Sequence, residues 1–291
     1  MHALRRFFAT LLATAMGAAL AVPAMAQVPH NWQLGMQAPG SPVAERLQSL
    51  HDLVFWIITI ITVFVAGLLV YVAWHFNSRR NPVASNVSHN TVLEIAWTAI
   101  PVLILVVIAI PSFRLAYFED RTPAADMTIK VTGHQWYWEY TYPDSAGLNF
   151  RSDYIHEEDL KPEQKALRLL AVDNPLVLPV GKNVRILTNS ADVIHSFFIP
   201  SLGVQRYTIP GRTIETWVRI DRPGAYYGEC NQICGTNHSY MPIAVVGVPA
   251  AEFQDWEKTA KVKFAAGAPI PMPALATVAE PTTIRVAGVQ P

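Results

Sequence analysis

Two long apolar runs without Asp, Glu, Lys or Arg constrain the fold of this chain more than any other feature. They cover residues 53–76 and 95–113. A helix rises 1.5 Å per residue, so about 20 residues cross the ~30 Å hydrocarbon core of a bilayer. Pro101 and Pro111 in the second run are compatible with a membrane helix, because neighbouring helices can satisfy the freed backbone groups. With 51% hydrophobic and 15% charged residues, the sequence predicts a transmembrane helical hairpin over residues 53–76 and 91–118.

The distribution of charge predicts how this hairpin is oriented. The connecting segment, residues 77–90, carries Arg79 and Arg80 and no acid, whereas acids lie beyond the other ends of the two runs at Asp52, Glu119 and Asp120. Loops rich in Lys and Arg stay on the cytoplasmic side of a membrane. The connection is therefore predicted to be cytoplasmic and residues 27–52 periplasmic, in a two-pass protein of a bacterial inner membrane.

The N-terminus predicts the same orientation. Residues 1–26 begin with Arg5 and Arg6, continue as an apolar region and end in Ala24-Met25-Ala26, the pattern of a cleaved secretory signal peptide. An uncleaved membrane helix is the alternative, although the apolar region is short for a span. Lys and Arg together number 22, as do Asp and Glu, and no basic tract is present. We therefore exclude nucleic-acid binding.

After the hairpin the sequence changes to short β-rich runs broken by turn residues. This pattern predicts a sandwich or barrel of the Greek-key kind over residues 119–264. The runs cover residues 127–132, 167–172, 183–188, 213–220 and 241–248. Residues 250–260 predict a short closing helix with Phe253 and Trp256 on one face. Residues 265–291, rich in Ala and Pro, are interpreted as a flexible tail without chemistry.

One loop in this region holds four side chains that bind soft metals. Cys230 and Cys234 are four residues apart, His238 follows four residues later and Met241 three residues after that. Thiolate and thioether suit copper, imidazole accepts it, and no carboxylate competes within the set. A single-copper electron-transfer site needs only one thiolate, so the second cysteine indicates two coppers bridged by both sulfurs.

Two coppers need one imidazole and one weak ligand each. His195 would supply the second imidazole, and a backbone carbonyl at Gln232 the second weak ligand. Two other sites compete with this interpretation. One is a disulfide, which is the commoner use of paired cysteines in exported proteins; the other is a tetrahedral zinc site, which would leave Met241 without a role.

The sequence around these ligands resembles subunit II of the haem–copper cytochrome c oxidases, with its binuclear CuA centre. The matching words are Asp192-Val-Ile-His195-Ser, Pro200-Ser-Leu-Gly203, Ile209-Pro-Gly-Arg212, Pro223-Gly-Ala-Tyr-Tyr-Gly228 and the loop itself through Pro242-Ile243. The resemblance extends from the first apolar run to about Lys263. It implies a cupredoxin-like fold and CuA ligation by His195, Cys230, Gln232 through its backbone carbonyl, Cys234, His238 and Met241.

The resemblance also implies roles outside the copper loop. Trp136 matches the exposed tryptophan through which the donor's electron passes toward copper, whereas its neighbours Trp138 and Tyr140 are predicted to be core residues. Glu94 matches a glutamate at the mouth of a proton-uptake path. The local sequence Thr91 to Glu94 also fits a capping box at the start of a helix. The two roles are compatible. Gln232 replaces the glutamate that binds Mg or Mn in the family. A neutral amide is a poorer ligand for a hard cation, so that second site at the boundary with subunit I is left open.

Acidic residues flank the aromatic segment and the first histidine ligand, and together they would attract a basic partner such as cytochrome c. Asp173 and Asp192 match acids of the family's docking face, although any single acid is more often a solvated surface residue. The full set is Asp144, Asp153, Glu157, Glu158, Asp159, Asp173 and Asp192.

These features predict the electron-input subunit of a proton-pumping cytochrome c oxidase, with subunit I and a third subunit as membrane partners. It would take electrons from cytochrome c at CuA and pass them to haem in subunit I, where oxygen is reduced. The principal alternative is a membrane-tethered copper carrier or assembly protein. A quinol oxidase subunit would lack the copper ligands, and a nitrous oxide reductase would lack the membrane hairpin.

Overall fold

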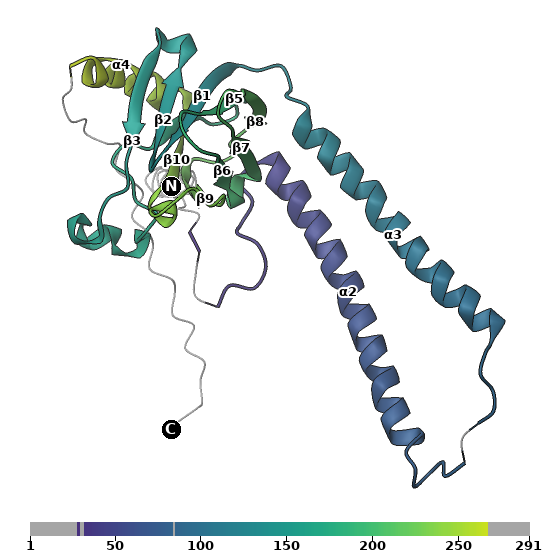
Figure 1. The fold of residues 1–291 in the computed structure, drawn as a ribbon. Helices are drawn as coiled ribbons and strands as arrows, with labels where there is room; N and C mark the ends of the chain where they lie inside the picture. Colours follow the sequence, from purple (N-terminus) through teal and green to yellow (C-terminus); the bar gives the residue numbers. More distant parts are fainter. Residues whose placement is uncertain (1–27, 30–31, 84, 267–291) are drawn as a thin grey trace, which may run out of the picture.

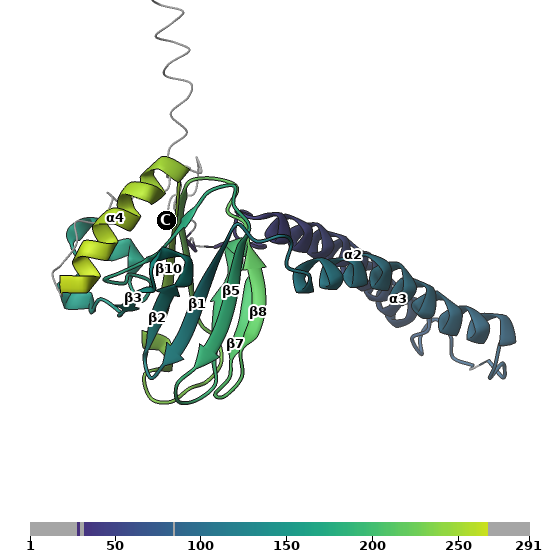
Figure 2. The same ribbon diagram turned by 90° about the horizontal axis from the view of Figure 1, so that it is seen from above.

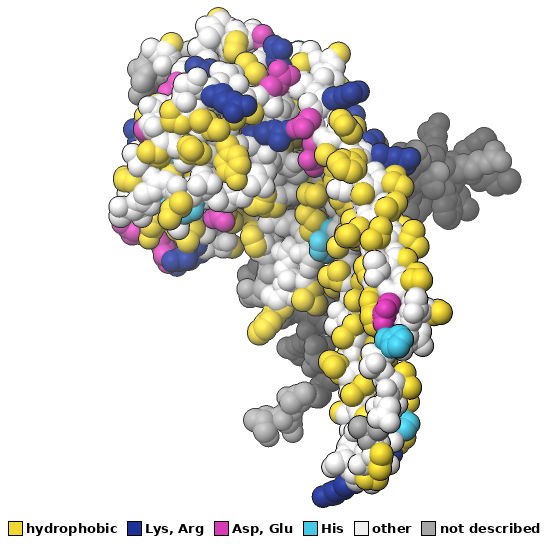
Figure 3. All heavy atoms as spheres, turned by 45° about the vertical axis from the view of Figure 1, so that its right-hand side comes forward, with side chains coloured by type: hydrophobic (Ala, Val, Ile, Leu, Met, Phe, Trp, Pro, Cys, Tyr) yellow, Lys and Arg dark blue, Asp and Glu magenta, His cyan; other side chains and the backbone are white. Residues whose placement is uncertain are grey.

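The computed structural model describes residues 28–29, 32–83 and 85–266. The predicted signal peptide and nearly all of the predicted tail lie outside these residues. Two long helices leave the β domain side by side and are joined at their far ends by the loop before residue 91 (Figure 1). They are α2, Pro42–His75, and α3, Thr91–Asp120. Both are long and apolar enough to cross a membrane, and hydrophobic side chains cover the visible face of this hairpin (Figure 3).

Both helices begin at polar caps that the sequence encodes. Ser41 caps α2 by accepting a hydrogen bond from the Ala44 amide at 3.1 Å. The cap of α3 is Asn90, whose side chain accepts from the Leu93 amide at 3.2 Å, so the predicted capping box beginning at Thr91 is displaced by one residue. Glu94 still completes the arrangement, because its carboxylate accepts from the Asn90 amide at 3.3 Å.

The β domain consists of two five-stranded sheets packed as a sandwich, which confirms the predicted fold class. The first has the order β3-β2-β1-β5-β8 and the second β4-β10-β9-β6-β7. Neighbouring strands are antiparallel except for β1 with β5 and β4 with β10. The first sheet contains β1 Met127–His134, β2 Tyr137–Tyr142, β3 Leu148–Ser152, β5 Val184–Ser190 and β8 Ile214–Val218. The second contains β4 Leu176–Pro179, β6 His195–Ile199, β7 Val204–Thr208, β9 Gly224–Cys230 and β10 Pro242–Val248.

One predicted strand is wrong. Residues 167–172 do not join a sheet: Leu167 ends the 3-10 helix η3, Pro162–Leu167, and Val172 makes only an isolated bridge to Tyr154. The apolar side chains of this run are buried in a small second core beside Tyr227 instead of alternating across a sheet. A loop with buried apolar side chains therefore has the same local composition as a strand.

The closing helix α4, Ala250–Ala266, is longer than predicted. Phe253 and Trp256 pack against the main core as expected, and the helix continues because Ala260 and Phe264 also contact that core. It lies along the side of the sandwich away from the hairpin (Figure 2). Trp138 and Tyr140, predicted to be core residues, are fully buried in the same core.

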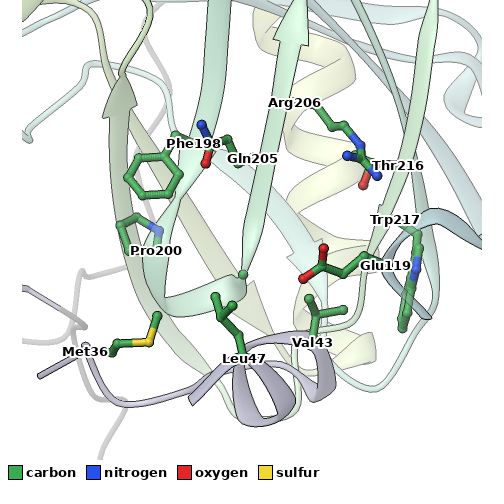
Figure 4. Close-up of a pocket in the computed structure, with 11 residues that line it drawn as sticks. Met36, Val43, Leu47, Glu119, Phe198, Pro200, Gln205, Arg206, Thr216 and Trp217 are labelled. Carbon is green, nitrogen blue, oxygen red and sulfur yellow. The ribbon is translucent and has the colours of Figure 1, made fainter. Parts of the chain in front are cut away.

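Both helices of the hairpin are attached to the β domain. Before α2, the Gly40 amide donates to the Ser201 carbonyl at 2.7 Å and the Ser41 hydroxyl donates to the Leu202 carbonyl at 2.6 Å. At the end of α3, the Phe118 carbonyl accepts from the Trp217 indole at 3.3 Å. Side chains from both attachments enclose a small cavity, with the Glu119 carboxylate facing it from α3 (Figure 4).

Candidate metal centre

Three neighbouring strands bring the predicted ligands to one end of the second sheet. Strands β9 and β10 pair so that Pro242 lies opposite Glu229, which places Cys230 beside Met241 at the ends of the loop between them. Strand β6 lies on the other side of β9, with Phe197 opposite Cys230. His195, the first residue of β6, therefore lies at the same edge as both ends of the cysteine loop.

The donor atoms of the predicted ligands converge. The Sγ atoms of Cys230 and Cys234 are 3.9 Å apart, and ligand atoms of His195 and both cysteines lie within 4.8 Å of one another. Cys234 Sγ is 3.5 Å from His238 Nδ1 and 3.5 Å from Met241 Sδ. All of these side chains except His238 are buried. The cluster thus combines sulfur and imidazole donors without a carboxylate ligand, a set that suits copper.

Gln232 takes part through its backbone. Its carbonyl oxygen lies 3.2 Å from Cys230 Sγ, so the peptide, and not the amide side chain, belongs to the cluster. A carbonyl here is equally available whether glutamine or glutamate occupies the position. Glutamine in place of the family's glutamate therefore does not remove this carbonyl from the cluster.

His195 is oriented by a second residue. Its Nε2 lies 2.8 Å from Asp192 Oδ1, and because a carboxylate only accepts, Nε2 carries the proton. The other nitrogen, Nδ1, is buried and has no hydrogen-bond partner among the described residues. A buried imidazole nitrogen with a free lone pair beside two thiols is the arrangement of a metal ligand whose outer partner fixes its tautomer.

Asp192 is held firmly in this position. Its carboxylate also accepts from the Gln135 amide at 2.7 Å and the Val193 amide at 2.6 Å. Burial alone would raise the pKa of the Asp192 carboxyl, but hydrogen bonds from His195, Val193 and Gln135 outweigh it and leave that pKa below its usual value. Asp192 is therefore ionised at neutral pH, and most of its acceptor capacity is directed into the protein.

The two cysteines are free thiols in this structure. Their Sγ separation of 3.9 Å is far longer than the ~2.05 Å of a disulfide. Burial, and to a smaller extent the neighbouring Cys230 thiol, raises the pKa of Cys234 to about 12. A bound cation would reverse this by stabilising the thiolate, which couples metal binding to proton release. The residues fit copper better than a disulfide or zinc, since Met241 Sδ lies within the cluster.

Trp136 contacts the cysteine loop directly. Its indole Nε1 lies 3.3 Å from the Cys234 carbonyl oxygen. The ring also packs against Gly235, where an added Cβ would approach the indole to 3.0 Å. The side chain is half-buried, not fully exposed as the resemblance implied. The indole thus touches Cys234, a predicted metal ligand, and the residue after it, while part of the side chain remains accessible.

Three further residues of the aromatic segment shape the site, although they were not predicted to. Gln135 donates to the same Cys234 carbonyl at 2.8 Å, and the Trp138 indole donates to the Met241 carbonyl at 3.2 Å. Gly133 allows the His195 ring to approach, because a Cβ there would lie 2.8 Å from His195 Cδ2. The only signal in the sequence was their proximity to Trp136.

The acids predicted to attract a partner lie in different places. Ser152 on β3 pairs with Trp138, so Asp153 follows at the Trp136 end of β2. Asp173 lies beside it, its carboxylate accepting from the Asp153 amide at 2.7 Å. Asp144, in contrast, follows the opposite end of β2 and binds the Thr128 amide. Asp144 therefore does not belong to the acidic group around Trp136.

Glu94 lies far from the metal cluster. It is in the first turn of α3, and the 26 residues from Glu94 to Asp120 span about 39 Å at 1.5 Å per residue. Glu94 therefore does not belong to the metal cluster, and its predicted role in proton uptake and the docking role of Asp173 and Asp192 stay predictions.

Comparisons with known proteins agree with this architecture. Residues 29–115 match the family described as cytochrome C oxidase subunit II, transmembrane domain, and residues 127–248 match the periplasmic domain of the same subunit. A probable cytochrome c oxidase subunit 2 of Rickettsia bellii is 51% identical over 79% of this chain and 85% of its own. Subunit 2 of Zea mays is 44% identical over 80% of this chain and 91% of its own.

A solved structure is also similar in sequence. The periplasmic domain of subunit II (CoxB) of Bradyrhizobium japonicum is 46% identical over 50% of this chain and 99% of its own, with a TM-score of 0.46. The two family models together span residues 29–115 and 127–248, which hold α2, most of α3 and the whole β sandwich with its cluster of sulfur and imidazole donors. The chain therefore belongs to the cytochrome c oxidase subunit II family.

Proposed function

We propose that this chain is the electron-input subunit of a bacterial inner-membrane cytochrome c oxidase, with its β domain in the periplasm. The cluster of His195, Cys230, Cys234, His238, Met241 and the Gln232 carbonyl would hold a binuclear CuA centre. Such a centre accepts single electrons from cytochrome c and passes them to haem in subunit I, where oxygen reduction is coupled to proton pumping. Subunit I, and with it a third subunit, are the expected membrane partners.

The observation that carries this proposal is the contact between Trp136 and the copper loop. The indole Nε1 and the Cys234 carbonyl are 3.3 Å apart, which gives a direct path from an accessible aromatic ring to a ligand residue. A copper carrier has no need of such a path, because it must release the metal itself. Here the Met241 residue is only 1% exposed, and both cysteines are buried.

The protein residues also favour electron transfer by holding the donors rigidly. Cys230 and Met241 lie at paired strand ends, His195 is fixed by Asp192, and Trp138 and Gln135 bind the loop carbonyls. A ligand set that cannot follow the geometry preferred by each oxidation state keeps the reorganisation energy small. The site is thus built to retain copper and exchange electrons.

Copper quantitation and electron paramagnetic resonance on the copper-loaded, full-length chain in detergent test the metal assignment. Two coppers per chain and a seven-line hyperfine pattern are expected for an electron shared by a bridged pair. One copper with a four-line spectrum, or no copper and an oxidised cysteine pair, would instead favour the copper carrier.

The path is tested separately in the assembled oxidase. Trp136→Phe should leave copper content and spectrum unchanged, because the indole is not a ligand, yet slow reduction of the copper by reduced cytochrome c. Trp56→Phe, on a 62% exposed tryptophan of α2, is the control and should behave as wild type. Equal rates for the two variants would exclude Trp136 as the site where the electron enters.

A role for Glu94 in proton uptake remains part of the proposal. Its carboxylate lies at the start of α3, the end predicted to face the cytoplasm, and there it also caps the helix. Glu94→Gln keeps an acceptor for the Asn90 amide but removes the ionisable proton. Oxygen consumption should fall in this variant while copper reduction by cytochrome c stays normal; unchanged oxygen consumption would leave only the capping role.

A further inference from the structure

The outer ends of the two membrane helices form a groove that no part of the proposed electron path uses. It has a volume of about 240 Å³ and is lined on α2 by Arg46, Ser49, Leu50 and Leu53, and on α3 by Pro111, Arg114 and Leu115. The lining is apolar apart from Ser49 and two arginines, one on each helix. None of these lining residues, all within the described part of the chain, is acidic.

The lengths of the apolar runs put the two arginines at the expected depth of lipid headgroups. The 20 residues from Glu94 to Arg114 span about 30 Å along α3, which is the thickness of the hydrocarbon core. With Glu94 at the predicted cytoplasmic boundary, Arg114 would lie at the opposite one. On α2, Arg46 is seven residues beyond Leu53, the end of the uncharged run. The groove thus extends from the headgroup region at Arg46 to the top of the hydrocarbon core at Leu53 and Pro111.

The two guanidinium groups are available for an anion. Arg46 stacks over the Phe118 ring at 3.5 Å, which orients it without neutralising its charge. Arg114 makes no ion pair with any acid that the structure describes. Asp52 pairs with His51 and Asp120 with Arg206, and among the described residues neither Glu45 nor Glu119 forms an ion pair with Arg46 or Arg114. A pair of cations above an apolar channel matches the phosphate and the first acyl carbons of a phospholipid.

We propose that this groove binds an anionic phospholipid of the outer leaflet. Its phosphate would lie between Arg46 and Arg114, and its acyl chains would extend from the glycerol past Leu53 and Pro111. A headgroup without an amine is favoured, because two arginines exceed the charge of one phosphate and an added ammonium would be repelled. This lipid would hold the two helices together at the level where they join the β domain, independently of copper.

Native mass spectrometry of the full-length chain in a mild detergent, titrated with phosphatidylglycerol or phosphatidylcholine, tests the proposal. Each juxtamembrane arginine changes anionic-lipid affinity by about fivefold, so Arg46→Gln and Arg114→Gln should each weaken phosphatidylglycerol binding about fivefold. The double variant should bind more weakly than either single variant, although not by their simple product, because both arginines would contact the same phosphate. Lysine at both positions should retain most of the binding. Phosphatidylcholine should bind more weakly than phosphatidylglycerol, and its binding should change little in the arginine variants. Arg79→Gln, an exposed arginine at the other end of the hairpin, is the matched control.

Three results would overturn the proposal. The first is unchanged phosphatidylglycerol affinity in the double variant. The second is an equal loss of both lipids, which would indicate a collapsed groove instead of phosphate recognition. The third is displacement of the lipid by millimolar inorganic phosphate, which would identify a free anion as the ligand. Helix content measured by circular dichroism confirms that the double variant is folded, so unfolding cannot mimic the expected result.

Discussion

Asp192→Asn removes the residue that orients His195 and should weaken copper binding without touching a ligand. The wild-type carboxylate accepts three N–H groups, from His195 Nε2, Gln135 and Val193, at 2.8, 2.7 and 2.6 Å. Asparagine has the same shape but only one acceptor oxygen, so at least one of these donors would face an NH₂ group. Leaving one such donor unpaired costs about 1–3 kcal/mol.

The same change acts on copper through the histidine. Even where the amide oxygen takes the place of Oδ1, it is a neutral and weaker acceptor for the Nε2 proton than a carboxylate. The imidazole is then held less firmly in the tautomer that leaves Nδ1, the nitrogen without a partner among the described residues, free to bind a metal. Removing the outer partner of a metal-bound histidine typically lowers metal affinity by about 10–100-fold. We expect a loss in this range for Asp192→Asn, together with the lower stability of the metal-free protein.

The assay is competition between the reduced full-length chain and a chromogenic copper chelator, with thermal unfolding of the metal-free protein measured in parallel. Asp221→Asn is the matched control, because the Asp221 side chain is 31% exposed against 30% for Asp192 and its partner is a surface arginine. Copper binding as tight in Asp192→Asn as in Asp221→Asn would refute the positioning role of Asp192.

Three other changes test the scaffold. Gly228→Ala would place a Cβ 1.9 Å from the Phe198 carbonyl, so the β domain should fail to fold, as seen in loss of the folded fraction by size exclusion; Gly67→Ala, with nothing within 4 Å, should be tolerated. Ser41→Ala removes the α2 cap and its bond to Leu202 and should lower the unfolding free energy by about 1–3 kcal/mol, measured against Ser49→Ala on the exposed helix surface. Burial raises the pKa of Tyr227 to about 12. The folded protein therefore keeps the Tyr227 proton where the unfolded chain loses it, and stability falls as pH rises from 10 toward 12. The fall in Tm over that range should be smaller in Tyr227→Phe, and an identical fall would contradict the raised pKa.

The membrane hairpin and the chemistry of the metal site could be predicted from local sequence. An uncharged run of about 20 residues has few stable alternatives to a membrane helix. Helix α3 contains the whole second run, and α2 contains the first except for Phe76, its C-cap residue. The residue types and spacing in the copper loop predict a soft-metal site formed by Cys230, Cys234, His238 and Met241. Short-range pattern was less reliable for residues 167–172, because a buried loop and a buried strand have the same apolar composition.

Tertiary structure decided how those residues act. No local sequence pattern predicts that β6 lies beside β9, yet that pairing brings His195 to the cysteine loop. The free nitrogen of His195, the inward-directed carboxylate of Asp192 and the contact of Trp136 with Cys234 all follow from strands that are distant in sequence. Residue chemistry and segment length are enough to say which donors are present and which segments are suited to a membrane. Only the packing of the sheets determined which atoms face the metal and which residues hold them, because orientation depends on neighbours that the chain order does not place together.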